Sequence, residues 1–339
     1  MGVRQVQGIQ AAELSDGAAF HRDVVQHCEP VILRGLCGDW PAVVAGRQEW
    51  AALARYLTEK DSGRTGRAFI GHATIRGRYD YGGQADGFNF SSEMLSVTQV
   101  IERMTGQAGD PDAPSIYLGS LPMSECLPAF AAENAARLLD SSVEPRLWIG
   151  TASDIACHYD TFDNLACVVA GRRRFTLYPP DSIGGLYVGP IDHTMAGAPV
   201  ALAAGSAKGD ERYPRFEAVR DRAMVAELEP GDALFLPKLW WHRVEATEPA
   251  NVLVNYWWDA FSAGPDAPMT AMMLAMIAIA ERPLAERHAW AAWFDHYVFR
   301  ERGHPLAHLP EAQHGILGAL KSGNYGRIRA FVMQKLRGM

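Results

Sequence analysis

A run of short apolar segments between Leu147 and Trp258 constrains the fold of this 339-residue chain more than any other feature. Segments such as Leu165–Ala170 and Ala233–Leu236 are rich in apolar residues, and glycine, proline or aspartate punctuates the chain between them. Apolar runs of this length, bounded by turn residues, are typical of β-strands. Many short strands separated by turns indicate a barrel or a sandwich. The sequence therefore predicts a mainly β core in the middle of the chain.

Helical and extended patterns precede this core. The spacing of apolar residues predicts three helices, over residues 12–27, 47–60 and 93–105. Ser91 or Ser92 is placed to cap the last of these helices. Pro30–Gly35 and Ser115–Gly119 predict strands, because each is a short apolar run that a glycine closes. We therefore expect helices to flank the β core.

Two longer segments show few regular patterns. Residues 63–90 contain many glycines and aromatic residues, which suggest strands and an irregular loop around Gly82-Gly83. Residues 184–217 interrupt the β region as a long insertion. Loops of this length in a compact domain are usually functional, often as a lid or a substrate wall. We expect both segments to shape specificity, although neither carries a code that names a substrate.

The chain changes character after residue 264, where the strand patterns stop. Residues 269–282 are rich in alanine and methionine and predict a helix. Apolar residues then recur at spacings of three and four, at Trp290, Trp293, Phe294, Tyr297 and Val298, and again at Ile328, Phe331, Val332 and Leu336. These stripes can pack against the β core or against a second copy of the chain. We predict two domains, residues 1–263 and a C-terminal helical region over 264–339 that forms a homodimer.

Composition excludes several classes of protein. The net charge of −7 gives no support to general nucleic-acid binding. The five cysteines are scattered without a CxxC pair, so neither a disulfide framework nor a zinc ribbon is indicated. The N-terminal residues lack the apolar stretch of a signal peptide, and the apolar run Met269–Ala280 is too short to span a bilayer. We expect a cytoplasmic protein that does not enter membranes.

Three residues have the chemistry of a metal site. His158 and Asp160 are two apart, so in a strand both side chains would lie on one face and could share a metal. His242 supplies a second imidazole from a distant strand. Two histidines and one carboxylate leave coordination positions open, which suits Fe(II) binding an oxoacid and O₂. The same residues could instead be hydrogen-bonded barrel residues without a metal, and residue types alone leave both interpretations open.

An oxoacid would also need a cation inside the barrel. In the segment after Gly171, Arg173 alternates with Phe175 and Leu177, so it lies on the more apolar face of the strand. A guanidinium on that face offers two parallel hydrogen bonds to a carboxylate. The alternative is that Arg173 extends to solvent along its aliphatic stem.

Three segments together resemble the JmjC and cupin-like hydroxylases: His158–Leu165, Gly171–Pro180 and Leu228–His242. The relatives in view are the asparaginyl hydroxylase that inhibits hypoxia-inducible factor, small JmjC lysyl hydroxylases and the tRNA wybutosine hydroxylase. The resemblance covers roughly residues 28–262. It implies a double-stranded β-helix, or jelly roll, as the catalytic domain. It also implies a reaction that uses Fe(II), 2-oxoglutarate and O₂.

The resemblance assigns roles residue by residue. It implies that His158, Asp160 and His242 bind iron, and that Arg173, Tyr117, Asn164, Asn255 and Trp257 surround 2-oxoglutarate. Arg173 and Tyr117 would contact the distal carboxylate, and the family usually has a lysine where this chain has Arg173. Ile155 replaces a threonine that the family often carries near the first ligand. Arginine is larger than lysine and forked, and isoleucine lacks the hydroxyl of threonine. Both departures therefore bear on which oxoacid is bound.

The expected activity is hydroxylation of a protein side chain or of another biomolecule. A 2-oxoglutarate oxygenase acting on a small metabolite is an alternative within the same chemistry. A cupin that binds a metal without catalysis is an alternative from another class. An extended groove at the barrel mouth would favour a polypeptide, and a closed pocket would favour a metabolite.

Overall fold

Two β-sheets form the centre of this computed structural model, which describes residues 3–81, 87–192, 194, 197–262, 264–320 and 323–338. The six-stranded sheet has the order β1 (Arg4–Gln5), β12 (Met224–Leu228), β11 (Arg173–Tyr178), β14 (Trp241–Ala246), β9 (Ser153–His158) and β5 (Arg78–Tyr79). The nine-stranded sheet has the order β2 (Gln7–Gln10), β3 (Val31–Arg34), β13 (Ala233–Leu236), β10 (Asp163–Ala170), β15 (Asn251–Trp258), β8 (Pro145–Gly150), β7 (Ser115–Pro122), β4 (Gly66–Gly71) and β6 (Phe90–Leu95).

The strands that follow residue 145 alternate between the two sheets. β8, β10, β13 and β15 belong to the larger sheet, and β9, β11, β12 and β14 belong to the smaller one. Neighbours within each set of four are antiparallel. This arrangement confirms the predicted jelly-roll core with flanking helices.

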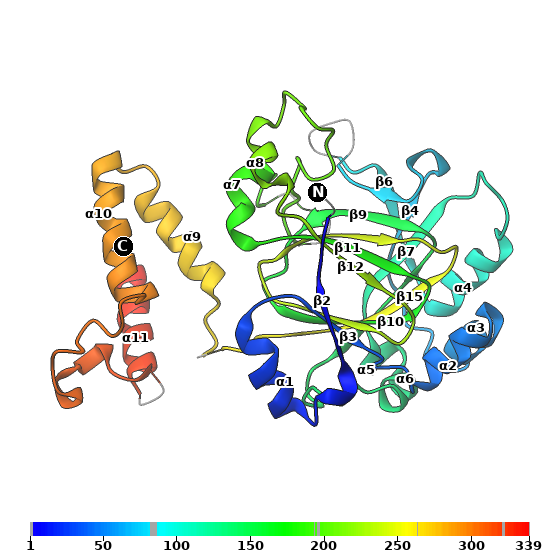
Figure 1. Cartoon of the computed structure of the whole chain (residues 1–339), viewed down its shortest axis with the longest axis horizontal. Coiled ribbons are helices and arrows are strands. Elements are labelled where there is room, and N and C mark those ends of the chain that lie inside the picture. Colours follow the sequence, from blue (N-terminus) through cyan, green and yellow to red (C-terminus); the bar gives the residue numbers. More distant parts are fainter. Residues whose placement is uncertain are drawn as a thin grey trace. The chain divides into compact units, whose positions relative to one another are not determined.

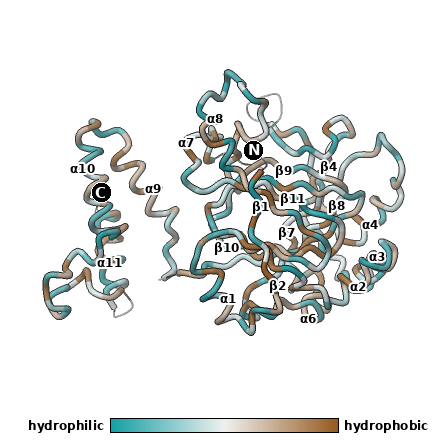
Figure 2. The backbone as a smooth tube through the Cα atoms, viewed as in Figure 1, coloured by the Kyte–Doolittle hydropathy of each residue, from teal (hydrophilic) through white to brown (hydrophobic). Residues whose placement is uncertain are grey.

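Helices cover the outer face of the larger sheet (Figure 1). They are α1 (Gly17–Asp23), α2 (Pro41–Gln48), α3 (Trp50–Thr58), α4 (Val97–Gly106), α5 (Met123–Cys126) and α6 (Pro128–Glu133). A second apolar cluster lies between the sheets and includes Phe175, Leu177 and Leu234. Every residue of β10 is buried, because helices cover one face of this strand and the other face lines the barrel. Figure 2 shows hydrophobic residues concentrated in the strands.

Three predicted helix boundaries are wrong, each for a local reason. The helix predicted over 12–27 is broken, because Asp16 caps a new start by accepting a hydrogen bond from the Ala19 amide at 2.8 Å. The prediction over 47–60 merged two helices, since extended Glu49 separates α2 from α3. Residues 93–95 belong to β6, and the cap of α4 is Ser96, not Ser91 or Ser92. Ser96 forms a capping box with Gln99.

The insertion expected over 184–217 contains short helical turns and joins the barrel wall. α7 (Ile183–Leu186) begins one residue before the expected start of the insertion, and α8 (Glu217–Arg220) begins at its expected last residue. Isolated bridges connect Val188 to Ala201 and Val200 to His158. Of the other expected loop, the residues around Gly82-Gly83 lie outside the described part of the chain.

The smaller compact unit comprises Phe261–Met339 and is helical. It contains α9 (Pro268–Ile279), α10 (Leu284–Phe294) and α11 (Asn324–Arg337). Among its described residues, only Pro305 and Asn324 are buried. The predicted aromatic stripe is exposed at Trp290 and Trp293, by 42% and 58%. No helix in the described residues of the chain has the length and apolar character needed to cross a membrane.

Candidate active site

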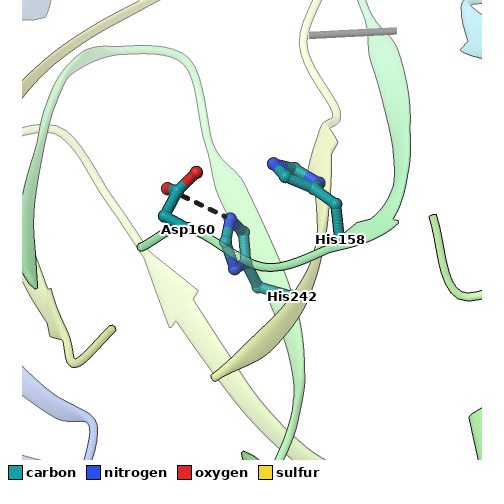
Figure 3. A group of neighbouring side chains, drawn as sticks. All are labelled: His158, Asp160 and His242. Carbon is teal, nitrogen blue, oxygen red and sulfur yellow. Dashed lines mark ion pairs between the residues drawn. The ribbon is translucent and has the colours of Figure 1, made fainter. Parts of the chain in front are cut away.

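The two histidines come from paired strands. His158 is the last residue of β9, and His242 is its direct partner in the neighbouring strand β14. Asp160 lies two residues beyond the end of β9, so the strand alternation expected for it is wrong, yet its side chain still faces the same point. One ligand atom from each residue lies within 4.8 Å of those of the other two (Figure 3).

Backbone carbonyl groups fix the orientation of both imidazoles. Nδ1 of His158 lies 2.8 Å from the carbonyl oxygen of Ala156, and Nδ1 of His242 lies 3.0 Å from that of Trp240. Because a carbonyl can only accept a hydrogen bond, Nδ1 carries the proton in each ring. Nε2 therefore has a free lone pair, which is the form that binds a metal.

The charge state of the group also suits a cation. Burial, reinforced by the nearby His158, lowers the pKa of His242 to about 4, so this imidazole is neutral at pH 7. Its Nε2 atom lies 3.7 Å from Oδ2 of Asp160. Two imidazoles and one carboxylate form a donor set that Fe(II) and related divalent ions bind.

Trp257 holds the carboxylate in place. Its indole Nε1 donates a hydrogen bond to Oδ2 of Asp160 at 3.2 Å. The sequence predicted Trp257 only as an aromatic residue near the pocket. Its hydrogen bond to a candidate metal ligand was not predicted. An outer hydrogen bond of this kind orients a ligand and tunes its affinity for the metal.

All eight residues that the sequence nominates line one cavity of about 330 Å³: Tyr117, His158, Asp160, Asn164, Arg173, His242, Asn255 and Trp257. The cavity lies between the sheets, because strands of both sheets contribute to its lining. Ile155, at the position where a threonine was expected, also lines it. Val200 adds a wall from the insertion over 184–217. The structure therefore brings the proposed metal ligands and cosubstrate residues together.

Arg173 is a buried cation in this cavity. Its side chain is 4% exposed, so the alternative in which it extends to solvent is wrong. Among the described residues its Nη1 atom has no hydrogen-bond partner, and no carboxylate forms an ion pair with it. Burial lowers the pKa of Arg173 to about 10, which leaves it charged at pH 7. A buried, unsatisfied guanidinium beside a cavity favours an anionic ligand.

Tyr117 faces the same cavity from β7. Burial raises the pKa of its hydroxyl, so the group remains protonated and able to donate. The neighbouring guanidinium of Arg173 opposes this shift. The pair thus offers one cation and one neutral donor to a single anion.

An amide network lies beside the donor set. Nδ2 of Asn255 donates to Oδ1 of Asn164 at 3.1 Å, and the indole of Trp148 donates to Oδ1 of Asn255 at 2.7 Å. The rings of Trp148 and Trp257 meet edge to face, with centroids 5.8 Å apart. These contacts fix both amides and the wall next to them.

Sequence reasoning missed Trp148 and two further aromatic residues of the lining, Phe69 and Tyr79. Trp148 could have been found, because in β8 it alternates with the core residues Leu147 and Ile149 and so faces the barrel. Phe69 and Tyr79 lie in residues 63–90, where the sequence pattern did not define the bounds of the strands. Their approach to the cavity depends on the pairing of β4 with β7 and of β5 with β9.

Comparisons with known proteins place this site in a family. A family model described as a cupin-like domain matches residues 17–264. HSPB1-associated protein 1 of Bos taurus is 30% identical over 203 residues, which are 57% of this chain and 39% of that protein. The bifunctional peptidase and (3S)-lysyl hydroxylase JMJD7 of Homo sapiens is 24% identical over 269 residues, or 71% of this chain and 80% of that protein. Lysine-specific demethylase JMJ31 of Arabidopsis thaliana is 34% identical over 119 residues, covering 33% of this chain and 20% of that protein.

The matches to the HSPB1-associated proteins span well under half of their length. The family model, by contrast, covers well over half of this chain and almost all of the larger unit. It also includes every residue of the cavity described above. The chain belongs to the cupin-like JmjC family, whose oxygenases use Fe(II) and 2-oxoglutarate.

Proposed function

We propose that this chain is an Fe(II)- and 2-oxoglutarate-dependent oxygenase that hydroxylates a protein side chain or another biomolecule. One observation carries the proposal. The group formed by His158, Asp160 and His242 faces the same cavity as the unsatisfied guanidinium of Arg173. A metal alone would account for the first feature but not for the buried cation.

The residues present fit both groups. Nε2 of each histidine and a carboxylate oxygen of Asp160 would hold Fe(II) and leave other positions open. 2-Oxoglutarate carries a second carboxylate at its far end. Nη1 of Arg173 and the hydroxyl of Tyr117 would bind it, which would satisfy the one buried side-chain nitrogen that has no partner among the described residues.

When bound, Fe(II) and 2-oxoglutarate supply the oxidation of a C–H bond by O₂, with release of succinate and CO₂. The chain's own residues prepare that chemistry. The carbonyls of Ala156 and Trp240 hold the two imidazoles in the ligating tautomer, and Trp257 orients Asp160. Arg173 fixes the direction of the oxoacid.

Apolar side chains keep the inner part of the site dry. Phe175, Val244 and Leu253 line the cavity around the donor set. Excluding water strengthens the electrostatic contacts of Arg173 and suppresses side reactions of the oxidant.

Succinate formation tests the proposal. The full chain would be reconstituted anaerobically with Fe(II) and 2-oxoglutarate, and O₂ would then be admitted. We expect succinate to accumulate in proportion to enzyme, slowly without a substrate, and Asp160→Ala to abolish it. Absence of succinate with every tested substrate pool, together with tight binding of Zn(II) by the same three residues, would leave the non-catalytic cupin as the better interpretation.

The named relatives and the cavity favour substrates of different size. The names of two relatives describe a lysyl hydroxylase and a protein associated with HSPB1, which supports a protein substrate. The cavity of about 330 Å³ lies in the range that small ligands occupy, which supports a metabolite. Demethylation of lysine uses the same chemistry, and one relative is named as a lysine-specific demethylase.

We infer further that the C-terminal unit binds a second copy of this chain. Its described residues include almost no buried side chain, and they expose Trp290, Trp293 and Val298 on α10 and the turn after it. A helical unit without a core of its own gains stability when such a face is covered.

A further inference from the structure

The opening of the cavity carries two arginines. We define the rim as Arg67, Ser120, Arg146 and Trp257, none of which is buried. Arg67, Ser120 and Trp257 line the cavity, and Arg146 contacts two of them. The rim is adjacent to the candidate metal centre, because Trp257 donates to the ligand Asp160.

Strand pairing positions both guanidinium groups. β4 carries Arg67 and pairs with β7, and β8 carries Arg146 and also pairs with β7, so the two arginines flank that strand. The register places Phe69 opposite Tyr117 and Pro122 opposite Arg146. Both arginines therefore lie beside the cavity, with side chains that are not buried.

Neither arginine has a carboxylate partner among the described residues. The guanidinium of Arg67 lies over the ring of Phe69, with its central carbon 5.3 Å from the ring centroid, and makes no described hydrogen bond or ion pair. Arg146 donates to the carbonyl oxygen and the hydroxyl of Ser120 at 3.0 and 3.1 Å. The central carbon of its guanidinium lies 5.8 Å from the centroid of the Trp257 ring. Most surface arginines that surround this domain, such as Arg64, Arg103 and Arg243, are paired with acidic residues.

The charged side chains around the cavity are mostly cationic. Of the described residues that line it, the acidic member is Asp160, and a bound metal would use that carboxylate. The cationic members are Arg67 and Arg173, with Arg146 next to them. A lysine ammonium that entered here would lose its hydrating water and gain no anionic partner. It would also meet two like charges. A carboxylate would instead meet two guanidinium groups that have no carboxylate partner among the described residues.

We propose that the rim selects a substrate that bears a carboxylate close to the carbon that reacts, and that it rejects a lysine side chain. The inference rests on the proposed oxygenase function and names the substrate class for the same site. The shared chemistry is the carboxylate, which an acidic peptide or a small organic acid could supply. A nucleic acid is disfavoured because the chain carries a net charge of −7 and only this pair of rim cations.

Retention of peptides without turnover tests the proposal. The full chain would be loaded with Zn(II) and 2-oxoglutarate, immobilised and exposed to three pools of ten-residue peptides. The pools would be identical except at two positions, which hold Asp or Glu, Lys or Arg, or Gln or Ser. Mass spectrometry of the retained peptides should show the acidic pool enriched about tenfold over the basic pool. Raising the salt concentration should weaken that enrichment, because Arg67 is exposed and Arg146 is partly exposed to solvent.

Variants identify the residues responsible. Arg67→Gln and Arg146→Gln should each lower the enrichment about threefold, and the double variant should remove it. Arg64→Gln is the matched control, because Arg64 is exposed, pairs with Glu125 and does not line the cavity. Competition by N-acetyl-aspartate amide as effectively as by the acidic peptides would assign the carboxylate to a small acid rather than to a polypeptide.

Four outcomes would overturn the inference: preference for the basic pool, no preference by charge, retention of a single-stranded RNA oligomer in place of the acidic pool, or weaker binding of 2-oxoglutarate as the main effect of both variants. Succinate formation measured on the same preparations separates this inference from the function beneath it. Acid selection without any succinate would contradict the oxygenase and leave the binding preference standing. Succinate formation without acid selection would contradict the rim proposal alone.

Discussion

The indole Nε1 of Trp257 donates a hydrogen bond to Oδ2 of Asp160 at 3.2 Å, so an aromatic residue on the barrel wall orients a candidate metal ligand. We expect Trp257→Phe, which keeps the ring but removes the donor, to weaken Fe(II) binding about tenfold. Titration of the protein with Fe(II) under anaerobic conditions measures the change. Trp290→Phe, at an exposed position of α10, is the control. Equal affinities for Trp257→Phe and the unaltered protein would show that the contact does not support the metal.

Removing one ligand should abolish the stabilisation that a metal provides. With metal at about one hundred times its dissociation constant, the unaltered protein should gain about 2.7 kcal/mol of unfolding free energy. His158→Ala, Asp160→Ala and His242→Ala should show no such gain in thermal unfolding with Mn(II). Exposed His288 provides the control His288→Ala, which should respond as the unaltered protein does. A normal metal response in all three ligand variants would refute the assignment.

Arg173 should affect stability and ligand binding in opposite directions. Arg173→Met removes a buried, unsatisfied guanidinium, so the ligand-free protein should gain about 1–3 kcal/mol in urea unfolding. The same change should weaken 2-oxoglutarate binding by about 30-fold or more, because the distal carboxylate loses its cation. Arg173→Lys should retain part of the binding.

Arg174→Met is the matched control for this experiment. Arg174 is the next residue of β11 and points to the opposite face. Its side chain is 47% exposed, and its Nε atom lies 4.0 Å from Oε1 of Glu227. We expect it to leave 2-oxoglutarate binding unchanged. Parallel effects of the two methionine variants would argue against a cosubstrate role for Arg173.

The proposed dimer should depend on the apolar stripe of the C-terminal unit. Trp293→Asp places a charge on the exposed ring cluster formed with Trp290 and Tyr297. A dimer that uses this face should weaken about 100-fold or more, as analytical ultracentrifugation would measure. Arg302→Asp, at an exposed polar position of the same unit, should have little effect. A monomer in the unaltered protein at all accessible concentrations would contradict the dimer.

The β core could be predicted because its information is local. Strands such as β10 and β13 are short apolar runs between turn residues, and the inward face of β11 followed from the alternation of Arg173, Phe175 and Leu177. The sequence nominated His158, Asp160 and His242 as candidate metal ligands from their residue types and from the family resemblance, and the structure brings the three side chains together.

What the sequence did not reveal depends on contacts between distant segments. The pattern put Asp160 in a strand, but β9 ends at His158 and the aspartate is held by Trp257 from β15. The cap of α4 was misplaced, because several serines precede that helix and only Ser96 completes the capping box. Nothing local in residues 63–90 signals that Arg67 and Phe69 face the cavity, since β4 reaches it only by pairing with β7.

The direct pairing of His158 with His242 has a consequence for how this protein can change over time. A slip of one residue in the pairing of β9 with β14 would turn the imidazole of the shifted strand to the opposite face of the sheet, away from the other imidazole, so the register that forms the sheet also brings the two candidate ligands together. The rim lies on β4, β7, β8 and β15, outside this pair of strands, and the described part of the insertion over 184–217 contacts β9 through the bridge between Val200 and His158. Mutations of Arg67, Arg146 or the described residues of the insertion can therefore change what enters the barrel while this strand pairing stays intact, which makes these positions the natural place for new specificities to arise.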